Sequence, residues 1–143
     1  MDDCIFCKFV KKEIEVAIVF ENDYVLAFLD TNPAGKLEGH TLVIPKIHCA
    51  TIDECDNNIL CETIKAIKLL VPAIKQVSGA QGINVIQNNG KAAGQFINHL
   101  HFHLIPREIG DGIRFDENRR NIKPMEQLEV SKAIKEALLH TKQ

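Results

Sequence analysis

The sequence has no long apolar run and no block of basic residues, and we expect no secretion signal. None of its apolar runs approaches the ~20 residues that a membrane-spanning helix needs, so we expect no membrane partner. Its 17 Lys and Arg stand against 19 Asp and Glu, a formal net charge of −2. Without clustered cations the chain is not expected to track a nucleic-acid polymer, although it could still bind a single nucleotide. The first residues, Met1-Asp2-Asp3, are acidic where a signal peptide is basic, so we expect a cytoplasmic protein.

The cysteine content does not indicate a disulfide framework. The count of five is odd, and no secretion signal is expected. Cys49, Cys55 and Cys61 are predicted to be small apolar fillers. Cys4 and Cys7 differ, because the Cys-x-x-Cys spacing is typical of a metal knuckle, although that spacing alone is a weak signal.

No internal repeat, linker or low-complexity tract divides the 143 residues, so a single domain is expected. Period-two and turn patterns predict strands over residues 17–21, 24–30, 40–45, 83–87 and 99–105. Apolar residues at steps of three and four predict a long helix over 56–77, with Asp56 as N-cap. Pro72 lies inside this pattern, so a kink or break is expected near Val71. A short helical turn is expected near 9–12, an irregular stretch over 107–122 and a last helix over 124–140. This order predicts an α+β fold, with a mainly antiparallel sheet and the long helix packed on one face.

The most informative stretch is His-Leu-His-Phe-His-Leu-Ile at 99–105. Alternation places Leu100, Phe102 and Leu104 on one face of a strand and three imidazoles on the other. Three interpretations remain open at this point: a half-exposed strand with a polar face, a metal site, and a phosphate site. In the phosphate site one imidazole attacks phosphorus while its neighbours supply N–H donors.

With its neighbouring motifs, this stretch resembles the histidine triad (HIT) family, in its Hint-like branch. The family pattern is His-φ-His-φ-His-φ-φ, where φ is apolar, and residues 99–105 match it throughout. Further segments match in order: Cys-Ile-Phe-Cys-Lys at 4–8, Ala-Phe-Leu-Asp at 27–30, Gly-His-Thr-Leu-Val-Ile-Pro-Lys at 39–46, Gln-Asn-Asn-Gly at 87–90 and Ala-Gly-Gln at 93–95. The resemblance covers roughly residues 4–107 and leaves the C-terminal extension, residues 113–143, outside the matched motifs.

The resemblance implies a hydrolase or transferase acting at the α-phosphate of AMP or GMP derivatives, such as adenosine phosphoramidate or an adenylate. His101 matches the nucleophile that forms a nucleotidyl-histidine intermediate. The backbone carbonyl of His99 would hold its second nitrogen, and His103 would donate to the phosphate or leaving atom. His40 matches a fourth histidine of the site. The positions matching nucleotide-binding residues are Asp30 for the ribose, Asn88, Gly94 and Gln95 for the phosphate, and Phe6, Phe28 and Leu42 for the base.

The resemblance also implies a structural zinc and a homodimer. Cys4, Cys7, His48 and His99 match a Cys2His2 zinc site found in some members. Members of this branch usually pair through the long helix and an edge strand.

Two departures from the family pattern bear on the reaction. Six residues separate Pro33 from His40 where four are usual, and Phe96 stands where animal members have a serine near the phosphate. Two alternatives therefore stay open: a nucleotide-binding or interaction module with vestigial catalysis, and a zinc-dependent hydrolase that uses the histidine row.

Overall fold

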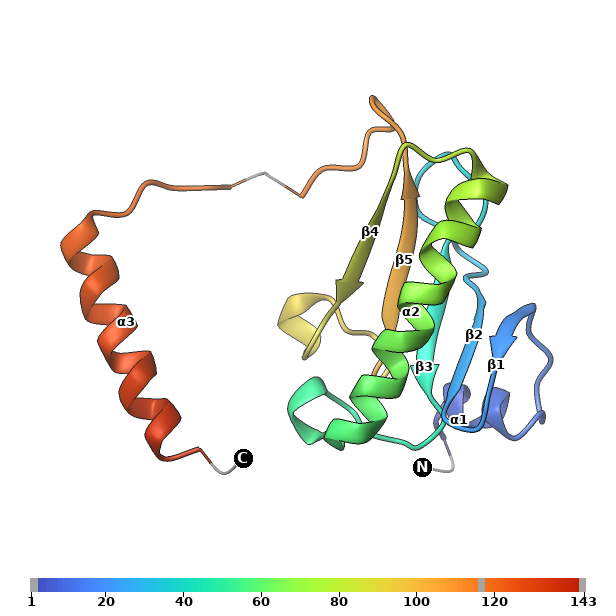
Figure 1. Ribbon diagram of the computed structural model, residues 1–143, viewed down its shortest axis with the longest axis horizontal. Coiled ribbons are helices and arrows are strands. Elements are labelled where there is room, and N and C mark those ends of the chain that lie inside the picture. Colours follow the sequence, from blue (N-terminus) through green and yellow to red (C-terminus); the bar gives the residue numbers. More distant parts are fainter. Residues whose placement is uncertain (1–2, 116–117, 142–143) are drawn as a thin grey trace. The chain divides into compact units, whose positions relative to one another are not determined.

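The described part of the protein, residues 3–115 and 118–141 of a computed structural model, contains five strands in one antiparallel sheet. The strands are β1 (Ile18–Glu21), β2 (Val25–Leu29), β3 (Thr41–Pro45), β4 (Gly82–Gln87) and β5 (Phe102–Arg107), in the order β1-β2-β3-β5-β4. The helices are α1 (Ile5–Val10), α2 (Asn57–Ser78) and α3 (Pro124–Leu139), with short 3-10 turns at Ile52–Glu54 and Lys91–Ala93. The α+β prediction is confirmed (Figure 1).

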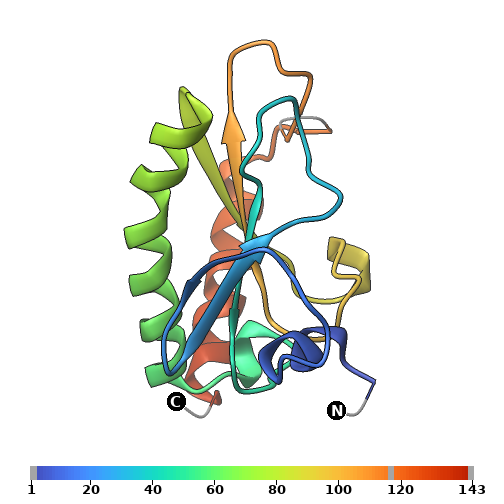
Figure 2. The ribbon, with the colours of Figure 1, turned by 90° about the vertical axis from the view of Figure 1, so that its right-hand side faces the viewer.

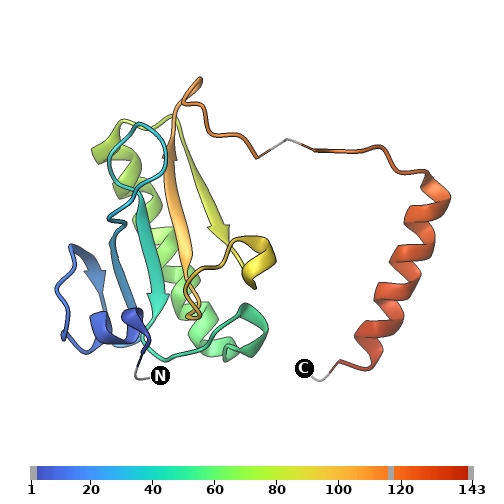
Figure 3. The ribbon, with the colours of Figure 1, turned by 180° about the vertical axis from the view of Figure 1, so that it is seen from behind.

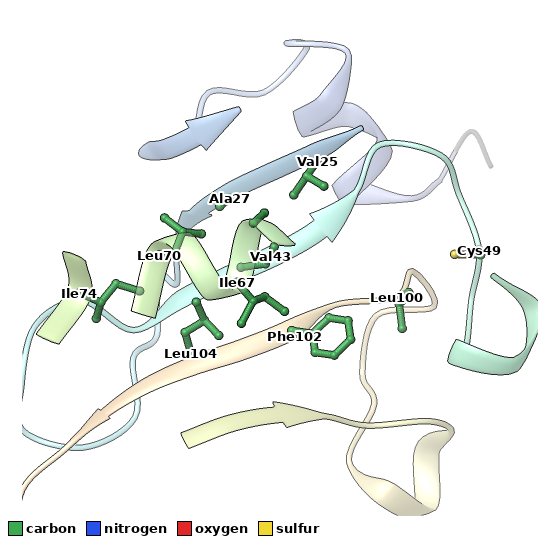
Figure 4. Packing of buried hydrophobic residues seen from close by; sticks show 11 residues of the cluster. Val25, Ala27, Val43, Cys49, Ile67, Leu70, Ile74, Leu100, Phe102 and Leu104 are labelled. Carbon is green, nitrogen blue, oxygen red and sulfur yellow. The ribbon is translucent and has the colours of Figure 1, made fainter. Parts of the chain in front are cut away.

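Helix α2 covers one face of the sheet, and α1 and the 91–93 turn lie on the other (Figure 2). Ile67, Leu70 and Ile74 of α2 pack against Leu100, Phe102 and Leu104 in one buried cluster (Figure 4); the cluster also holds Val25, Ala27, Val43, Cys49 and Ala66. The apolar half of the histidine stretch therefore meets the long helix, as its alternation predicts. The imidazoles are left for the opposite face.

The N-cap of α2 is as predicted. Of the kink or break expected near Val71, the break is wrong. Oδ1 of Asp56 accepts hydrogen bonds from the N–H groups of Asn58 and Ile59, at 2.8 and 3.4 Å. The helix continues through Pro72 to a left-handed Gly79. Pro72 is exposed, so the carbonyl group that loses its partner there can bond to water.

Two further elements differ from their predicted bounds. The first helix begins at Ile5 rather than near Phe9, because the side chain of Cys4 caps the N–H of Cys7. Strand β5 begins only at Phe102, so His99 and His101 precede it. The N–H of Leu100 donates to the carbonyl of Cys49 at 2.7 Å, in the loop after β3, which takes this segment out of the sheet ladder.

The chain divides into two compact units, Met1–Ile113 and Arg114–Gln143. The first holds the sheet, α1 and α2, and the second holds α3. None of the helices among the described residues is long and apolar enough to cross a membrane. All the residues discussed as a site below lie in the first unit.

Candidate active site and metal centre

The site lies on the sheet face away from α2, which Figure 3 turns toward the viewer. The pairing register places Phe28 of β2 opposite Leu42 of β3, and Leu42 opposite His103 of β5, so these side chains form one row. Phe6 of α1 joins this row by packing its ring edge-on against Phe28, with centroids 5.5 Å apart. The predicted base-pocket residues are therefore brought together in one apolar cluster next to the histidines.

His101 is held in a single tautomer. Its Nδ1–H donates to the carbonyl oxygen of His99 at 2.8 Å, so the lone pair lies on Nε2. The ring is buried and packs edge-on against Phe6, with centroids 5.3 Å apart. A neutral imidazole whose second nitrogen is fixed in this way has the form required of a nucleophile.

A chain of hydrogen bonds fixes the protons of the two neighbouring histidines. The backbone N–H of Ala34 donates to Nδ1 of His40 at 2.8 Å, so the ring proton of His40 is on Nε2. Nε2 of His40 lies 3.0 Å from Nδ1 of His103, which must therefore accept. The remaining nitrogen of His103, Nε2, carries the proton, and its ring lies 5.0 Å from that of His101 by centroids.

Burial keeps both members of this pair neutral. It lowers the pKa of His103 to about 4, with the neighbouring rings of His101 and His40 adding to the effect and Asp30 opposing it. The pKa of His40 is also lowered by burial and is partly restored by Asp30. At neutral pH His103 therefore presents a neutral N–H donor beside the lone pair of His101.

Asp30 lies at the end of β2 and joins the histidine pair. One carboxylate oxygen accepts the N–H of Asn32 at 2.8 Å, and the other lies 3.6 Å from Nε2 of His40. The possible ligand atoms of Asp30, His40 and His103 lie within 4.8 Å of one another. A metal on Nε2 of His40 would require the imidazolate anion, with no proton on either ring nitrogen, because Nδ1 already accepts the Ala34 N–H. The hydrogen bonds thus favour a site in which His40 and His103 act as N–H donors, and they argue against a metal ion bound by these residues.

The loop after β4 contributes a fixed turn with small residues. Gly94 has φ +88°, and a Cβ built on it would lie 3.7 Å from Nδ2 of Asn88, so the backbone passes close to that amide. Gln95 is buried, and its oxygen accepts the N–H of Gly90 at 2.7 Å. Its amide nitrogen donates to the carbonyl groups of Ala50 and Ile97. The Gln95 side chain is therefore occupied in holding the loop, whereas Phe96 beside it is 88% exposed.

A second cluster brings together the four predicted zinc ligands, Cys4, Cys7, His48 and His99, whose ligand atoms lie within 4.8 Å of one another. Nε2–H of His99 donates to the carbonyl of Pro45 at 2.8 Å, which leaves Nδ1 to face Sγ of Cys4 at 3.4 Å. A ring whose second nitrogen is anchored to a carbonyl is the usual arrangement of a zinc-binding histidine.

Burial keeps this histidine neutral, as a metal ligand must be, by lowering the pKa of His99 to about 4. Burial and the neighbouring Cys4 raise the pKa of the Cys7 thiol to about 11, a cost that a bound cation would offset. The donor set and its geometry are consistent with zinc.

Three groups that act on the histidines are not apparent from the sequence. The N–H of Ala34 and the carbonyls of Pro45 and His99 are backbone groups, which occur at almost every residue and so leave no mark in the sequence.

The stretch 107–122, predicted to be irregular, contains a buried ion pair. Arg107 belongs to β5, and Asp111 is buried and pairs with it at 2.6 Å. Asp111 is a single acidic residue between Gly110 and Gly112, a pattern that does not predict a buried ion pair.

Comparisons with known proteins show which proteins this chain is similar to. The HIT domain model matches residues 11–110. An uncharacterised HIT-like protein of Methanocaldococcus jannaschii is 47% identical over 92% of this chain and 98% of its own. Adenosine 5'-monophosphoramidase hnt1 of Schizosaccharomyces pombe is 42% identical over 77% of this chain and 80% of its own.

Solved structures share the fold. The crystal structure of SMU.412c from Streptococcus mutans has a TM-score of 0.90 and 33% identity, covering 96% of this chain and 87% of that one. A zinc-bound histidine triad family protein from Mycobacterium smegmatis has a TM-score of 0.73 and 29% identity, covering 99% of each chain.

Proposed function

Because this chain belongs to the histidine triad family, we propose that it is a nucleotide hydrolase or transferase that forms a nucleotidyl-histidine intermediate on His101. The observation that carries the proposal is the proton arrangement. The His99 carbonyl leaves Nε2 of His101 as a bare lone pair, and His103 presents an N–H next to it. Relatives named as adenosine 5'-monophosphoramidases support a substrate of the AMP type.

The reaction is a double displacement at phosphorus. The Nε2 lone pair of His101 forms an N–P bond while the bond to the leaving group breaks. The leaving group takes that electron pair and a proton from solvent, and the N–H of His103 stabilises the charge that develops there. Water then attacks phosphorus, its proton passes to solvent, and the N–P electron pair returns to His101. Throughout the reaction, the Nδ1–H of His101 keeps its hydrogen bond to the His99 carbonyl.

The nucleotide would be held by residues on either side of this pair. The carboxylate of Asp30 has two acceptor oxygens, which suit the two hydroxyl groups of a ribose. Asn88 and the backbone at Gly94 would bind the phosphate oxygens. The apolar cluster of Phe6, Phe28 and Leu42 would form one wall for the base.

Replacing the nucleophile tests the proposal. His101→Ala is expected to reduce turnover of adenosine 5'-phosphoramidate at least about 10³-fold, because the covalent route is removed. Rapid quench of the wild type followed by mass spectrometry should find an AMP adduct on the peptide that carries His101. Circular dichroism checks that the variant is folded. Undiminished turnover would contradict the proposal, and tight AMP binding with no turnover in the wild type would favour a binding module.

We also propose that the Cys2His2 cluster holds one structural zinc per chain. Bound zinc would tie α1, which carries Cys7, to the loop that carries His48 and to the segment before β5. Metal analysis of the purified protein should find one zinc, and Cys7→Ala should lose it and lower the melting temperature. His101→Ala, which removes a neighbouring ring but no ligand, should keep the metal. A wild type purified without zinc and equally stable with added zinc would overturn the proposal.

A further inference from the structure

The loop after β5 is built around one ion pair that fixes a backbone segment. The guanidinium of Arg107 bonds both oxygens of Asp111, at 2.6 and 2.8 Å, and Asp111 is buried. The same two side chains hold Ile113 at both of its peptide groups. Its N–H donates to Asp111 at 3.1 Å, and its carbonyl accepts from Arg107 at 2.8 Å. Ile113 therefore has a fixed position although it lies near the surface.

The side chain of Ile113 lies against the enlarged loop that follows β2. Gly35 has φ +78°, and a Cβ built on it would lie 3.0 Å from Cδ1 of Ile113. The methyl group of Ile113 thus lies against the side of Gly35 where a Cβ would project. The ends of this loop are held separately, since Asp30 binds the N–H of Asn32 and Gly39 packs near Ile74 of α2. Ile113 supports its middle.

Ala34, the residue before Gly35, donates the N–H that fixes which ring nitrogens of His40 and His103 carry protons. We propose that Ile113 is a positioning residue, which holds Gly35 so that the N–H of Ala34 stays on Nδ1 of His40. The inference rests on the proposed function, in which His103 must carry its proton on Nε2. The Arg107–Asp111 ion pair therefore acts on the reaction through Ile113, without touching a histidine.

Loss of this support has a specific chemical consequence. Without the Ala34 N–H, the neutral His40 ring can carry its proton on Nδ1 and turn a lone pair on Nε2 toward His103. His103 then carries its own proton on Nδ1, and its Nε2 is bare. The donor beside His101 is lost from those molecules at neutral pH. Acid restores it, because a second proton on the pair protonates His103 at Nε2 again.

Two titratable groups, Asp30 and His101, face the His40–His103 pair. Asp30 lies 3.6 Å from Nε2 of His40, and the ring of His101 lies 5.0 Å from that of His103 by centroids. Neither is changed by a substitution at Ile113. Their effects on the pH profile are therefore common to the wild type and the variant, and cancel in the ratio of the two rates.

Ile113→Ala tests the inference, with Ile109→Ala as a matched control. Ile109 is in the same loop, and its side chain is 90% exposed. For Ile113→Ala, kcat for adenosine 5'-phosphoramidate at neutral pH should fall about tenfold, because the pair is both displaced and mixed in tautomer. The ratio of variant to wild-type rate should rise as the pH falls. Ile109→Ala should match the wild type, and Ile113→Leu, which keeps a δ-methyl group, should recover most of the rate.

A nitrogen NMR experiment on the histidine rings gives a readout independent of turnover. The wild type should show the proton of His40 and of His103 on Nε2, and Ile113→Ala should show a mixture of tautomers. An unchanged tautomer in Ile113→Ala, or a rate ratio constant with pH, would overturn the inference. If the wild type shows the expected tautomers but turns over no nucleotide, it is the proposed function that fails.

Discussion

The buried carboxylate of Asp111 accepts four hydrogen bonds. It takes two from Arg107 and one each from the N–H groups of Glu108 and Ile113. These donors stabilise the charged form, so the Arg107 guanidinium, with the two backbone groups, holds the pKa of Asp111 well below its usual range. A carboxyl group held in this way couples the stability of the fold to pH.

The sign of this coupling can be tested with Asp111→Asn. A lowered pKa in the folded state means that the unfolded chain binds the proton more readily, so the carboxylate stabilises the fold above its ordinary pKa of ~3.9. At pH 7 the wild type should withstand more urea than Asp111→Asn. As the pH falls below about 4, the difference between the two urea midpoints should shrink. A difference that stays constant down to acid would show that Asp111 acts through neutral hydrogen bonds alone.

At the scale of an element, α2 shows how one sequence pattern serves both fold and site. Its buried residues, among them Ile67 and Ile74, hold the apolar half of the histidine stretch, and so fix the imidazoles on the other face. Its contribution is to determine which way the segment 99–105 faces.

Shortening a side chain of α2 should lower the free energy of unfolding in proportion to how deeply that side chain is buried. Ile67 is 5% exposed, so Ile67→Ala is expected to reduce the free energy of unfolding by about 2–5 kcal/mol. Lys68, on the same helix, is exposed, and Lys68→Ala should change it by less than about 0.5 kcal/mol. Chemical denaturation measures both. Equal losses in the two variants would mean that the helix packs differently from this description.

At the scale of the whole molecule, we propose that two chains pair through α2 and the edge strand β4. β4 is at one edge of the sheet, and an edge strand presents unpaired backbone groups. Val85 of β4 is 47% exposed, and Ile64, Leu69 and Val77 of α2 are also exposed. Apolar surface on both elements suits an interface between two copies.

Light scattering should give the wild type a mass of twice the 16.0 kDa of one chain. Val85→Glu places a charge in the proposed interface and should shift the protein to monomer at micromolar concentration. Val19→Glu is its control, because Val19 lies on the opposite edge strand, β1, and is 43% exposed. A wild-type monomer, or dissociation by Val19→Glu instead, would contradict this pairing.

Much of the fold was predictable from local patterns. The alternation of Leu100, Phe102 and Leu104 gave the buried face correctly, and the spacing of Ile67 and Ile74 gave the long helix. The start of β5 was not predictable, since it depends on a hydrogen bond from Leu100 to Cys49, which is distant in sequence. Continuity at Pro72 depends on its exposure to solvent, which periodicity does not report.

For the two sites, the chemical inventory could be predicted from the sequence: five histidines, a carboxylate and two thiols in segments that one fold would bring together. Which ring nitrogen carries each proton depends on the partners that the folded chain places beside the rings. The deciding partners are the N–H of Ala34 and the carbonyls of His99 and Pro45. Such groups occur at almost every residue, so no residue type marks them, and their effect arises only where the folded chain places them against a ring.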